Sequence, residues 1–132
     1  MMDVKAEQLE VKHDLAAPRA SRRFVTGVLR RWSVPADVVD SAQLLVSELV
    51  SNAVLHGRGP ISVIVAPTDV ARMFRIEVRN SGIREPVMRH AAPHELSGRG
   101  LHIVHELSHD WGTATDNGVT SVWFEMHADA FT

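Results

Sequence analysis

An apolar segment with helical spacing, residues 36–55, constrains the fold of this chain more than any other feature. Its apolar residues recur every three or four positions: Val38, Ala42, Leu45, Val46, Leu49, Val50 and Ala53. This period is typical of a helix with one buried face. Gly57 and the pair Gly59-Pro60 predict where the helix ends. Because such a face must pack against another layer, the segment predicts a layered domain with one core.

Five further stretches alternate apolar with polar residues or are rich in β-forming residues, and they predict strands: 9–15, 61–65, 74–78, 111–114 and 120–126. An earlier helix is predicted from Pro18 to Trp32, where apolar residues again have helical spacing. Turn residues at 67–69 and 116–118 favour antiparallel hairpins. Helices segregated from a meandering sheet, mixed but mainly antiparallel, make the expected fold class α+β, a two-layer α/β sandwich.

The segment between Ser81 and Ser97 is polar and has no clear period. Structureless connections of this length are uncommon and are often functional lids. We therefore expect a lid over about 81–97, followed by a short helix over 101–107.

Length and composition predict a single cytoplasmic domain, residues 1–132. The net charge of −2 predicts neither a nucleic-acid nor an anionic-membrane partner. A solvated helix face accounts for the one cluster of basic residues at least as well as a binding patch does: Arg19, Arg22, Arg23, Arg30 and Arg31. The absence of cysteine excludes disulfides, thiolate metal sites and cysteine nucleophiles. No signal-like run is seen, and no stretch approaches the roughly 20 apolar residues of a membrane span.

Three polar residues on the second predicted helix are the first candidate for a site. Glu48, Asn52 and His56 are spaced four apart and share one face beside the apolar stripe. They offer a carboxylate, an amide and an imidazole that point the same way. From the spacing alone, a solvated polar face is the better explanation, but the stripe lies against the core side and the helix ends at Gly57 just after it.

A glycine-rich helix start is the second candidate. The sequence Gly98-Arg99-Gly100-Leu101 exposes backbone N–H groups at a predicted helix N-terminus, which suits a phosphate. A tight turn is the simpler interpretation of these glycines. No Walker loop is present because no Gly-Lys-Ser/Thr follows, and the segment does not follow a strand as a dinucleotide fingerprint does.

The end of a strand is the third candidate. There the chain runs through Asn80 and Ser81 to Gly82, so an amide could bond a nucleobase edge with close approach of the backbone. A plain exit from strand to turn is the alternative.

The order of these segments resembles the nucleotide-binding domain of histidine kinases, gyrase B, heat-shock chaperones and mismatch-repair ATPases, the Bergerat fold. The segment 48–57 looks like the N-box of single-domain anti-sigma-factor serine/threonine kinases of the actinobacterial type. Residues 97–101 through Trp111-Gly112 look like their second glycine box, and 122–125 like their closing strand. The resemblance covers about 15–126.

This resemblance implies ATP and Mg²⁺ as ligands, with Asn52 coordinating the metal. Glu48 would orient or deprotonate the attacking hydroxyl of a partner's serine or threonine. His56 would either approach the phosphates or cap its helix. The remaining implied ligand contacts come from two groups: Gly98, Arg99, Gly100 and Leu101 for the phosphates, and Asn80, Gly82 and either Thr120 or Ser121 for the base.

Two residues depart from the family pattern. Asn80 stands where relatives carry an aspartate that accepts the adenine amino group, and Arg84 stands where they usually have a glycine. Loss of a charge-assisted bond costs about 1–3 kcal/mol. The site is then either a weakened ATP site or one retuned to another purine, such as guanine.

The leading functional hypothesis is an ATP-dependent kinase that phosphorylates an anti-anti-sigma (STAS-type) partner, sequesters a sigma factor, or does both. The alternative is a catalytically impaired regulator that acts through protein contacts alone. Related kinases often form homodimers, so a dimer is expected to be possible. A metal site at His102, His105 and His109 is a weaker hypothesis, since an exposed helix face explains that spacing.

Overall fold

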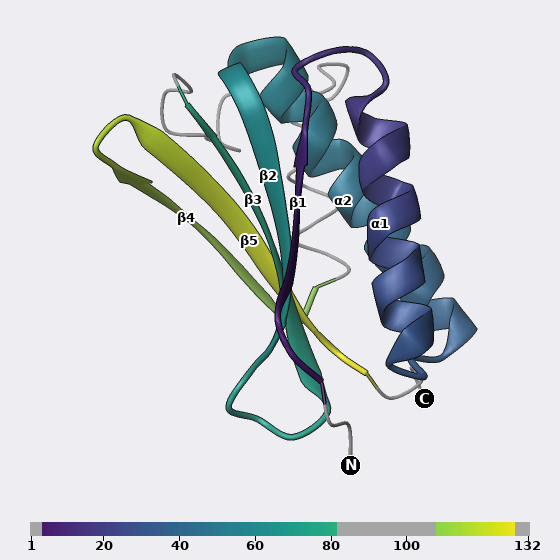
Figure 1. The fold of residues 1–132 in the computed structure, drawn as a ribbon. Helices are drawn as coiled ribbons and strands as arrows, with labels where there is room; N and C mark the ends of the chain where they lie inside the picture. Colours follow the sequence, from purple (N-terminus) through teal and green to yellow (C-terminus); the bar gives the residue numbers. More distant parts are fainter. Residues whose placement is uncertain (1–3, 82–107, 129–132) are drawn as a thin grey trace, which may run out of the picture.

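The computed structural model describes residues 4–81 and 108–128 (Figure 1). Its elements are, in chain order, β1 (Glu7–Val11), α1 (Ala17–Arg31), α2 (Ala36–His56), β2 (Arg58–Pro67), β3 (Met73–Ser81), β4 (Asp110–Asp116) and β5 (Val119–His127). The five strands form one sheet in the order β1-β2-β3-β5-β4. Both helices cover the same face of this sheet (Figure 1). The expected α+β two-layer sandwich is confirmed.

Each strand pairing in this part of the chain is antiparallel. The sheet was expected to be mixed, and a parallel pair does not occur among the described strands. Both helices lie between β1 and β2 in the sequence, and β2 then pairs with β1, with Glu7 opposite Val65. A connection of one helix would bring the chain back for a parallel strand. The second helix carries the chain to the opposite end of the sheet, so β2 runs antiparallel to β1.

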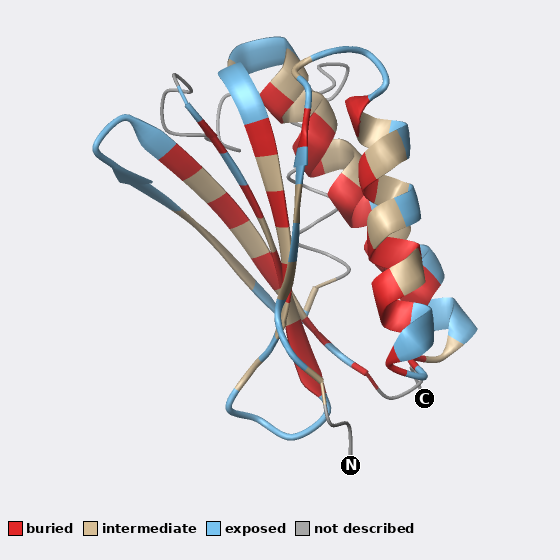
Figure 2. Ribbon diagram, in the orientation of Figure 1, coloured by how far each residue is buried: buried red, intermediate tan, exposed pale blue. Residues whose placement is uncertain are grey.

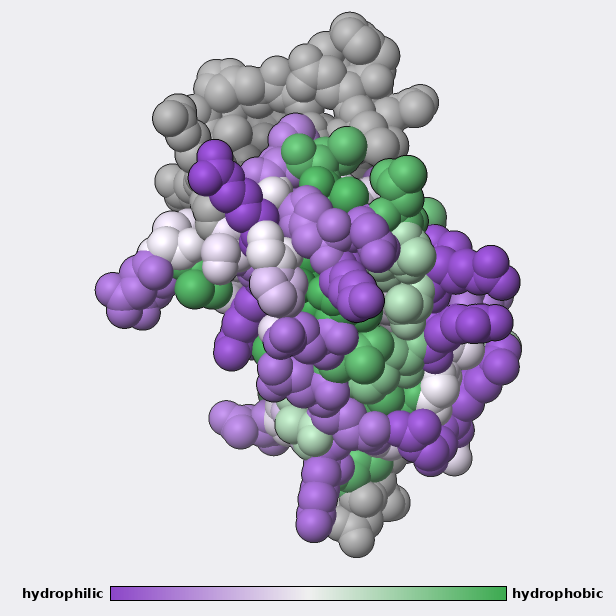
Figure 3. Space-filling view, turned by 45° about the horizontal axis from the view of Figure 1, so that its top comes forward, coloured by the Kyte–Doolittle hydropathy of each residue, from purple (hydrophilic) through white to green (hydrophobic). Residues whose placement is uncertain are grey.

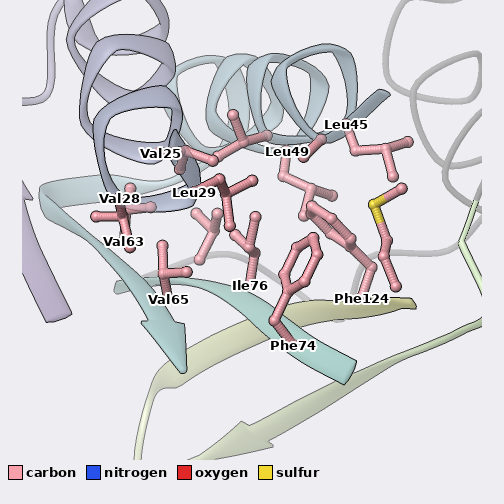
Figure 4. Close-up of a cluster of buried hydrophobic side chains, with 14 of the residues drawn as sticks. Val25, Val28, Leu29, Leu45, Leu49, Val63, Val65, Phe74, Ile76 and Phe124 are labelled. Atoms are coloured by element: carbon pink, nitrogen blue, oxygen red, sulfur yellow. The ribbon is translucent and has the colours of Figure 1, made fainter. Parts of the chain in front are cut away.

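The core lies between the two layers (Figures 2 and 4). All seven apolar residues predicted for the long helix are buried. They pack with α1 residues such as Val25 and Leu29 against Phe74 of β3 and Phe124 of β5, each of these four with no exposed surface.

By length and hydropathy alone α2 could span a membrane, contrary to the sequence expectation. Its apolar face is instead accounted for by burial against the sheet.

Strand β1 is shorter than the predicted strand 9–15 because a turn begins after Val11. The Asp14 carboxylate accepts a hydrogen bond from the Ala16 N–H at 2.9 Å, and its carbonyl accepts one from the Ala17 N–H at 3.1 Å. An aspartate bonded to the backbone two residues on initiates a turn and competes with strand pairing. Leu15 is consequently 90% exposed.

The closing hairpin has the predicted position. Asn117 and Gly118 connect β4 to β5 with φ of 52° and 78°. A two-residue turn with positive φ at both positions matches the twist of the flanking strands, and Asn-Gly is the sequence that favours it.

The arginines of α1 mostly face solvent, and hydrophilic residues cover the side of the molecule where α1 lies (Figure 3). Arg22 is half-buried and donates to the Ser47 hydroxyl at 3.1 Å, which ties α1 to α2. Arg31 pairs with Glu7 of β1. These contacts favour the solvated helix face over a basic binding patch.

Gly112 in β4 leaves room for the Trp123 side chain, on the sheet face that no described helix covers. A Cβ at this position would lie 2.6 Å from Cζ2 of Trp123 on the paired strand. The Arg75 guanidinium stacks over the Trp123 ring, with Cζ 4.0 Å from the ring centroid, and bonds Glu125, which holds the indole in place. We expect Gly112→Ala to lower the free energy of unfolding by about 1–3 kcal/mol, measured by urea denaturation.

Gly27→Ala is the matched control for this substitution. Gly27 lies inside α1, and an added Cβ would meet only the flexible end of Arg31, at 3.6 Å. Alanine at a helix interior is favoured by about 1 kcal/mol over glycine, so this variant should be at least as stable as the wild type. Equal stability of both variants would contradict the assigned packing of Trp123.

Candidate functional site

The polar face predicted on the long helix lies near its C-terminal end. Glu48 and Asn52 are half-buried, and His56 in the last turn is exposed. The Oδ1 atom of Asn52 is buried and accepts no hydrogen bond from the described residues. Leaving a buried acceptor without a donor costs about 1–3 kcal/mol, so this oxygen requires an explanation outside the described packing.

The strand residues of the site are Asn80 and Thr120. They are direct cross-strand neighbours on β3 and β5 and are 3% and 1% exposed. Ser121 pairs with Arg79 on the opposite face of the sheet, away from the helices. Of the two candidates Thr120 and Ser121, only Thr120 therefore shares the helix-covered face with Asn80.

Asn80 contacts the junction between α2 and β2. Its Nδ2 donates to the Arg58 carbonyl at 2.8 Å, while its Oδ1 is buried without a donor among the described residues. Gly57, the residue after α2, makes room for this amide: a Cβ there would lie 1.3 Å from the Asn80 Oδ1. The end of α2 and the end of β3 are thereby packed directly together, at the upper end of the sandwich in Figure 1.

His13 is a part of this region that the sequence did not reveal. Its Nε2 lies 2.8 Å from the carbonyl oxygen of Val54 in the last turns of α2, and its Nδ1 lies 3.1 Å from that of Gly59. The ring thus links the β1–α1 turn to both sides of the α2–β2 junction. Both partners are backbone carbonyls, which have no signature in residue types, and the pattern had placed His13 in a strand.

We expect His13→Ala to lower the free energy of unfolding by about 1–3 kcal/mol, because the junction loses the ring N–H that donates to one of its two carbonyl groups and the packing of the ring between them. Urea denaturation measures this difference. Lys12→Ala, at the exposed position before it, should change stability by less than about 0.5 kcal/mol. A loss no greater than that of the control would show that His13 does not hold the junction.

Several candidate residues lie outside the described residues, and their predicted roles stay predictions. These are Gly82, Arg84, Gly98, Arg99, Gly100, Leu101, His102 and His105, together with the helix over 101–107 and the lid predicted over about 81–97, except for Ser81, which ends β3. In the part of the chain that is described, no group of three or more metal-binding side chains occurs. His109 instead contacts His127 edge-on, at 4.7 Å between ring centroids.

Comparison with known proteins decides the family of this domain. Residues 11–126 match the histidine kinase-like ATPase domain. The chain belongs to this family. The resemblance noted in the sequence is thereby confirmed at the level of the family, and a histidine kinase-like ATPase domain is expected to bind ATP. No curated protein matches the chain closely enough to count as a relative.

Two solved structures share the histidine kinase-like ATPase fold. The RsbU and RsbW domains of Rv1364c from Mycobacterium tuberculosis match with a TM-score of 0.74 and 18% identity, over 94% of this chain and 32% of that one. The histidine kinase domain of the blue-light activated histidine kinase EL346 from Erythrobacter litoralis matches with a TM-score of 0.50 and 23% identity, over 71% of this chain and 46% of that one. The chain thus spans less than half of each structure, and at these identities the likeness shows the fold.

Proposed function

We propose that this protein binds Mg-ATP between α2 and the strand pair β3–β5, and that it is an anti-sigma-factor-type serine/threonine protein kinase. It would phosphorylate an anti-anti-sigma (STAS-type) partner in the cytoplasm and sequester a sigma factor, and so regulate transcription. One observation carries the proposal: α2 and β3 each supply a buried amide oxygen without a donor in the described structure, Asn52 Oδ1 and Asn80 Oδ1.

The donor types at these positions fit the two ligands. An amide oxygen is a hard ligand of the kind that Mg²⁺ takes together with phosphate oxygens and water, so Asn52 suits the metal. Asn80 and the Thr120 hydroxyl offer hydrogen-bonding groups to a nucleobase. Bound ATP would supply the phosphoryl group, and the Mg²⁺ ion would neutralise part of the phosphate charge.

Glu48 lies one helical turn before Asn52 and is half-buried on the same face. It would accept the proton of the partner's attacking hydroxyl, for which a carboxylate must lie within hydrogen-bond reach of that group. Phosphorylation adds a charge of about −1.5 to −2, which is sufficient to weaken a protein interface and release the partner.

The anti-sigma branch of this proposal is supported by the similarity to a solved structure that contains an RsbW domain. The family match covers almost the whole chain, and the structure that contains an RsbW domain matches over 94% of it. The competing candidate is a regulator without kinase activity. It is favoured by Asn80, whose neutral amide lacks the charge of the family's aspartate.

Identification of the partner by co-purification from the native cell, followed by incubation of both proteins with labelled ATP, tests the proposal. We expect a STAS-type protein or a sigma factor to co-purify, and label to pass to a serine or threonine of the STAS-type protein. Binding of the partner without transfer of label would instead support the non-catalytic regulator.

A further inference from the structure

Two exposed leucines lie on one side of α2. Leu44 is 43% exposed and Leu55 is 57% exposed, whereas Leu45 and Leu49 between them point into the core (Figure 4). Each residue of an α-helix is turned by about 100° and rises by about 1.5 Å, so Leu44 and Leu55 lie about 16 Å apart along the axis and only about 20° apart around it. The two exposed side chains therefore share one stripe of the helix.

This stripe faces neither of the two layers that α2 packs against. The sheet side of α2 holds its buried apolar residues, and the α1 side is marked by Gln43 and Ser47. Gln43 donates to the Thr26 hydroxyl at 2.7 Å, and the Ser47 hydroxyl accepts from Arg22 at 3.1 Å. Single exposed apolar residues are common on protein surfaces and need no explanation. Two leucines aligned on one helix stripe instead form a surface that a partner can cover.

Glu48 lies on the same stripe, between the two leucines. By the helix geometry it is about 40° around the axis from Leu44 and about 20° from Leu55. The proposed proton acceptor must come within about 2.6–3.2 Å of the partner's hydroxyl oxygen. A segment that delivers this hydroxyl to Glu48 therefore has to lie over the stripe, with one leucine on each side of the reacting group.

The charge of the stripe indicates the chemistry of that segment. Asp37 is exposed in the first turn of α2 and lies within about 20° of Glu48 around the axis. The whole helix contains no lysine and no arginine. A partner segment with basic residues would be complementary to this surface, whereas an acidic one would be repelled.

We propose that the stripe formed by Leu44, Glu48 and Leu55 is the docking surface for the phosphoacceptor segment of the partner protein. That segment carries an apolar residue on each side of its serine or threonine, and basic residues toward the Asp37 end of the stripe. The inference rests on the proposed kinase function and adds where the protein substrate binds and which features the kinase recognises in it.

The double variant Leu44→Gln/Leu55→Gln tests the two apolar contacts. Glutamine has a helix propensity close to that of leucine, and both positions are exposed, so the fold is retained. With the co-purified STAS-type partner as substrate, KM should rise at least about tenfold. The single-turnover rate at saturating partner and the affinity for Mg-ATP should stay within about twofold, as expected when only uniform binding is lost.

Val70→Gln is the matched control, since Val70 is 56% exposed in the turn between β2 and β3. It should leave KM, the transfer rate and ATP affinity unchanged. Higher salt should raise the KM of the wild type, because screening weakens the attraction between the acidic stripe and a basic segment. A KM of L44Q/L55Q equal to that of V70Q would overturn the proposal.

Crosslinking locates the segment directly. The chain contains no cysteine, so Leu44→Cys or Leu55→Cys allows a photo-crosslinker to be attached at one position only. Labels at positions 44 and 55 should crosslink to the STAS-type partner on opposite sides of its phosphorylated serine or threonine, and a label on V70C should give no such product. Crosslinks to a second copy of the chain, or to a part of the partner remote from the phosphorylated residue, would overturn the proposal.

The outcomes separate this inference from the proposed function. Label transfer with an unchanged KM in L44Q/L55Q overturns the docking surface and keeps the kinase. Partner binding that is weakened in L44Q/L55Q, without label transfer by the wild type, keeps the stripe as a partner surface and removes the kinase assignment. A changed oligomeric state of L44Q/L55Q in sedimentation, with unaltered partner affinity, assigns the stripe to a homodimer and overturns the inference. Failure of the wild type to bind the partner overturns both.

Discussion

Glu48→Gln is expected to slow phosphoryl transfer to the partner by about 100-fold or more while Mg-ATP binding is retained. Glutamine keeps the length and hydrogen-bonding shape of the side chain but cannot accept the proton of the attacking hydroxyl. Single-turnover transfer of labelled phosphate, with the protein in excess over the partner, measures this step directly, and calorimetry checks the nucleotide affinity.

Asp40→Asn is the control for the lost charge, since Asp40 is exposed near the start of the same helix. Its transfer rate should stay within about twofold of the wild type, as expected for a surface substitution outside the site. Transfer by E48Q at the wild-type rate would exclude Glu48 as the proton acceptor, whereas loss of ATP binding in E48Q would assign it to the nucleotide.

Asn52→Ala is expected to keep or raise the stability without nucleotide and to reduce the stabilisation by Mg-ATP. Without nucleotide, the variant should be as stable as the wild type or more stable, because it removes a buried acceptor that has no donor in the described structure. With Mg-ATP at about 100 times its dissociation constant, the wild type gains about 2.7 kcal/mol, or roughly 10 °C in the unfolding temperature. The variant should lose most of this gain.

Thermal unfolding with and without Mg²⁺ and ATP measures both quantities in one experiment. Ser51→Ala, at the neighbouring half-buried position, should keep the full gain from Mg-ATP. If N52A is strongly destabilised without ligand, the Asn52 amide is a structural group and the proposed metal ligand is lost. An undiminished gain from Mg-ATP in N52A would contradict the role in the same way.

Regular elements could be predicted because their signals are local. The apolar period of α2 identified its buried face except for Val39, and Asn117-Gly118 identified the closing hairpin. The expectation that α2, β3 and β5 lie around one candidate site followed from the order of motifs rather than from periodicity. The structure added what a motif does not encode, namely that Thr120 and not Ser121 shares a face with Asn80.

Contacts between side chains and distant backbone could not be predicted. His13 lies between carbonyl groups 41 and 46 residues away, and Asn80 donates to one 22 residues away. Carbonyl groups are present at every position, so no residue type marks such a partner. The end of β1 was misplaced for a related reason: the alternation of residues 9–15 continues past the turn that Asp14 initiates.

The strand order has a consequence for how the molecule opens. Strand β1 lies at the edge of the sheet and pairs with β2 alone, whereas β3 pairs on both sides. Detachment of β1 breaks one ladder, but release of β3 requires two ladders to separate. Local fluctuations that release the first strand therefore leave β3 and β5 paired, and amide hydrogens of these two strands should be among the last to exchange with solvent.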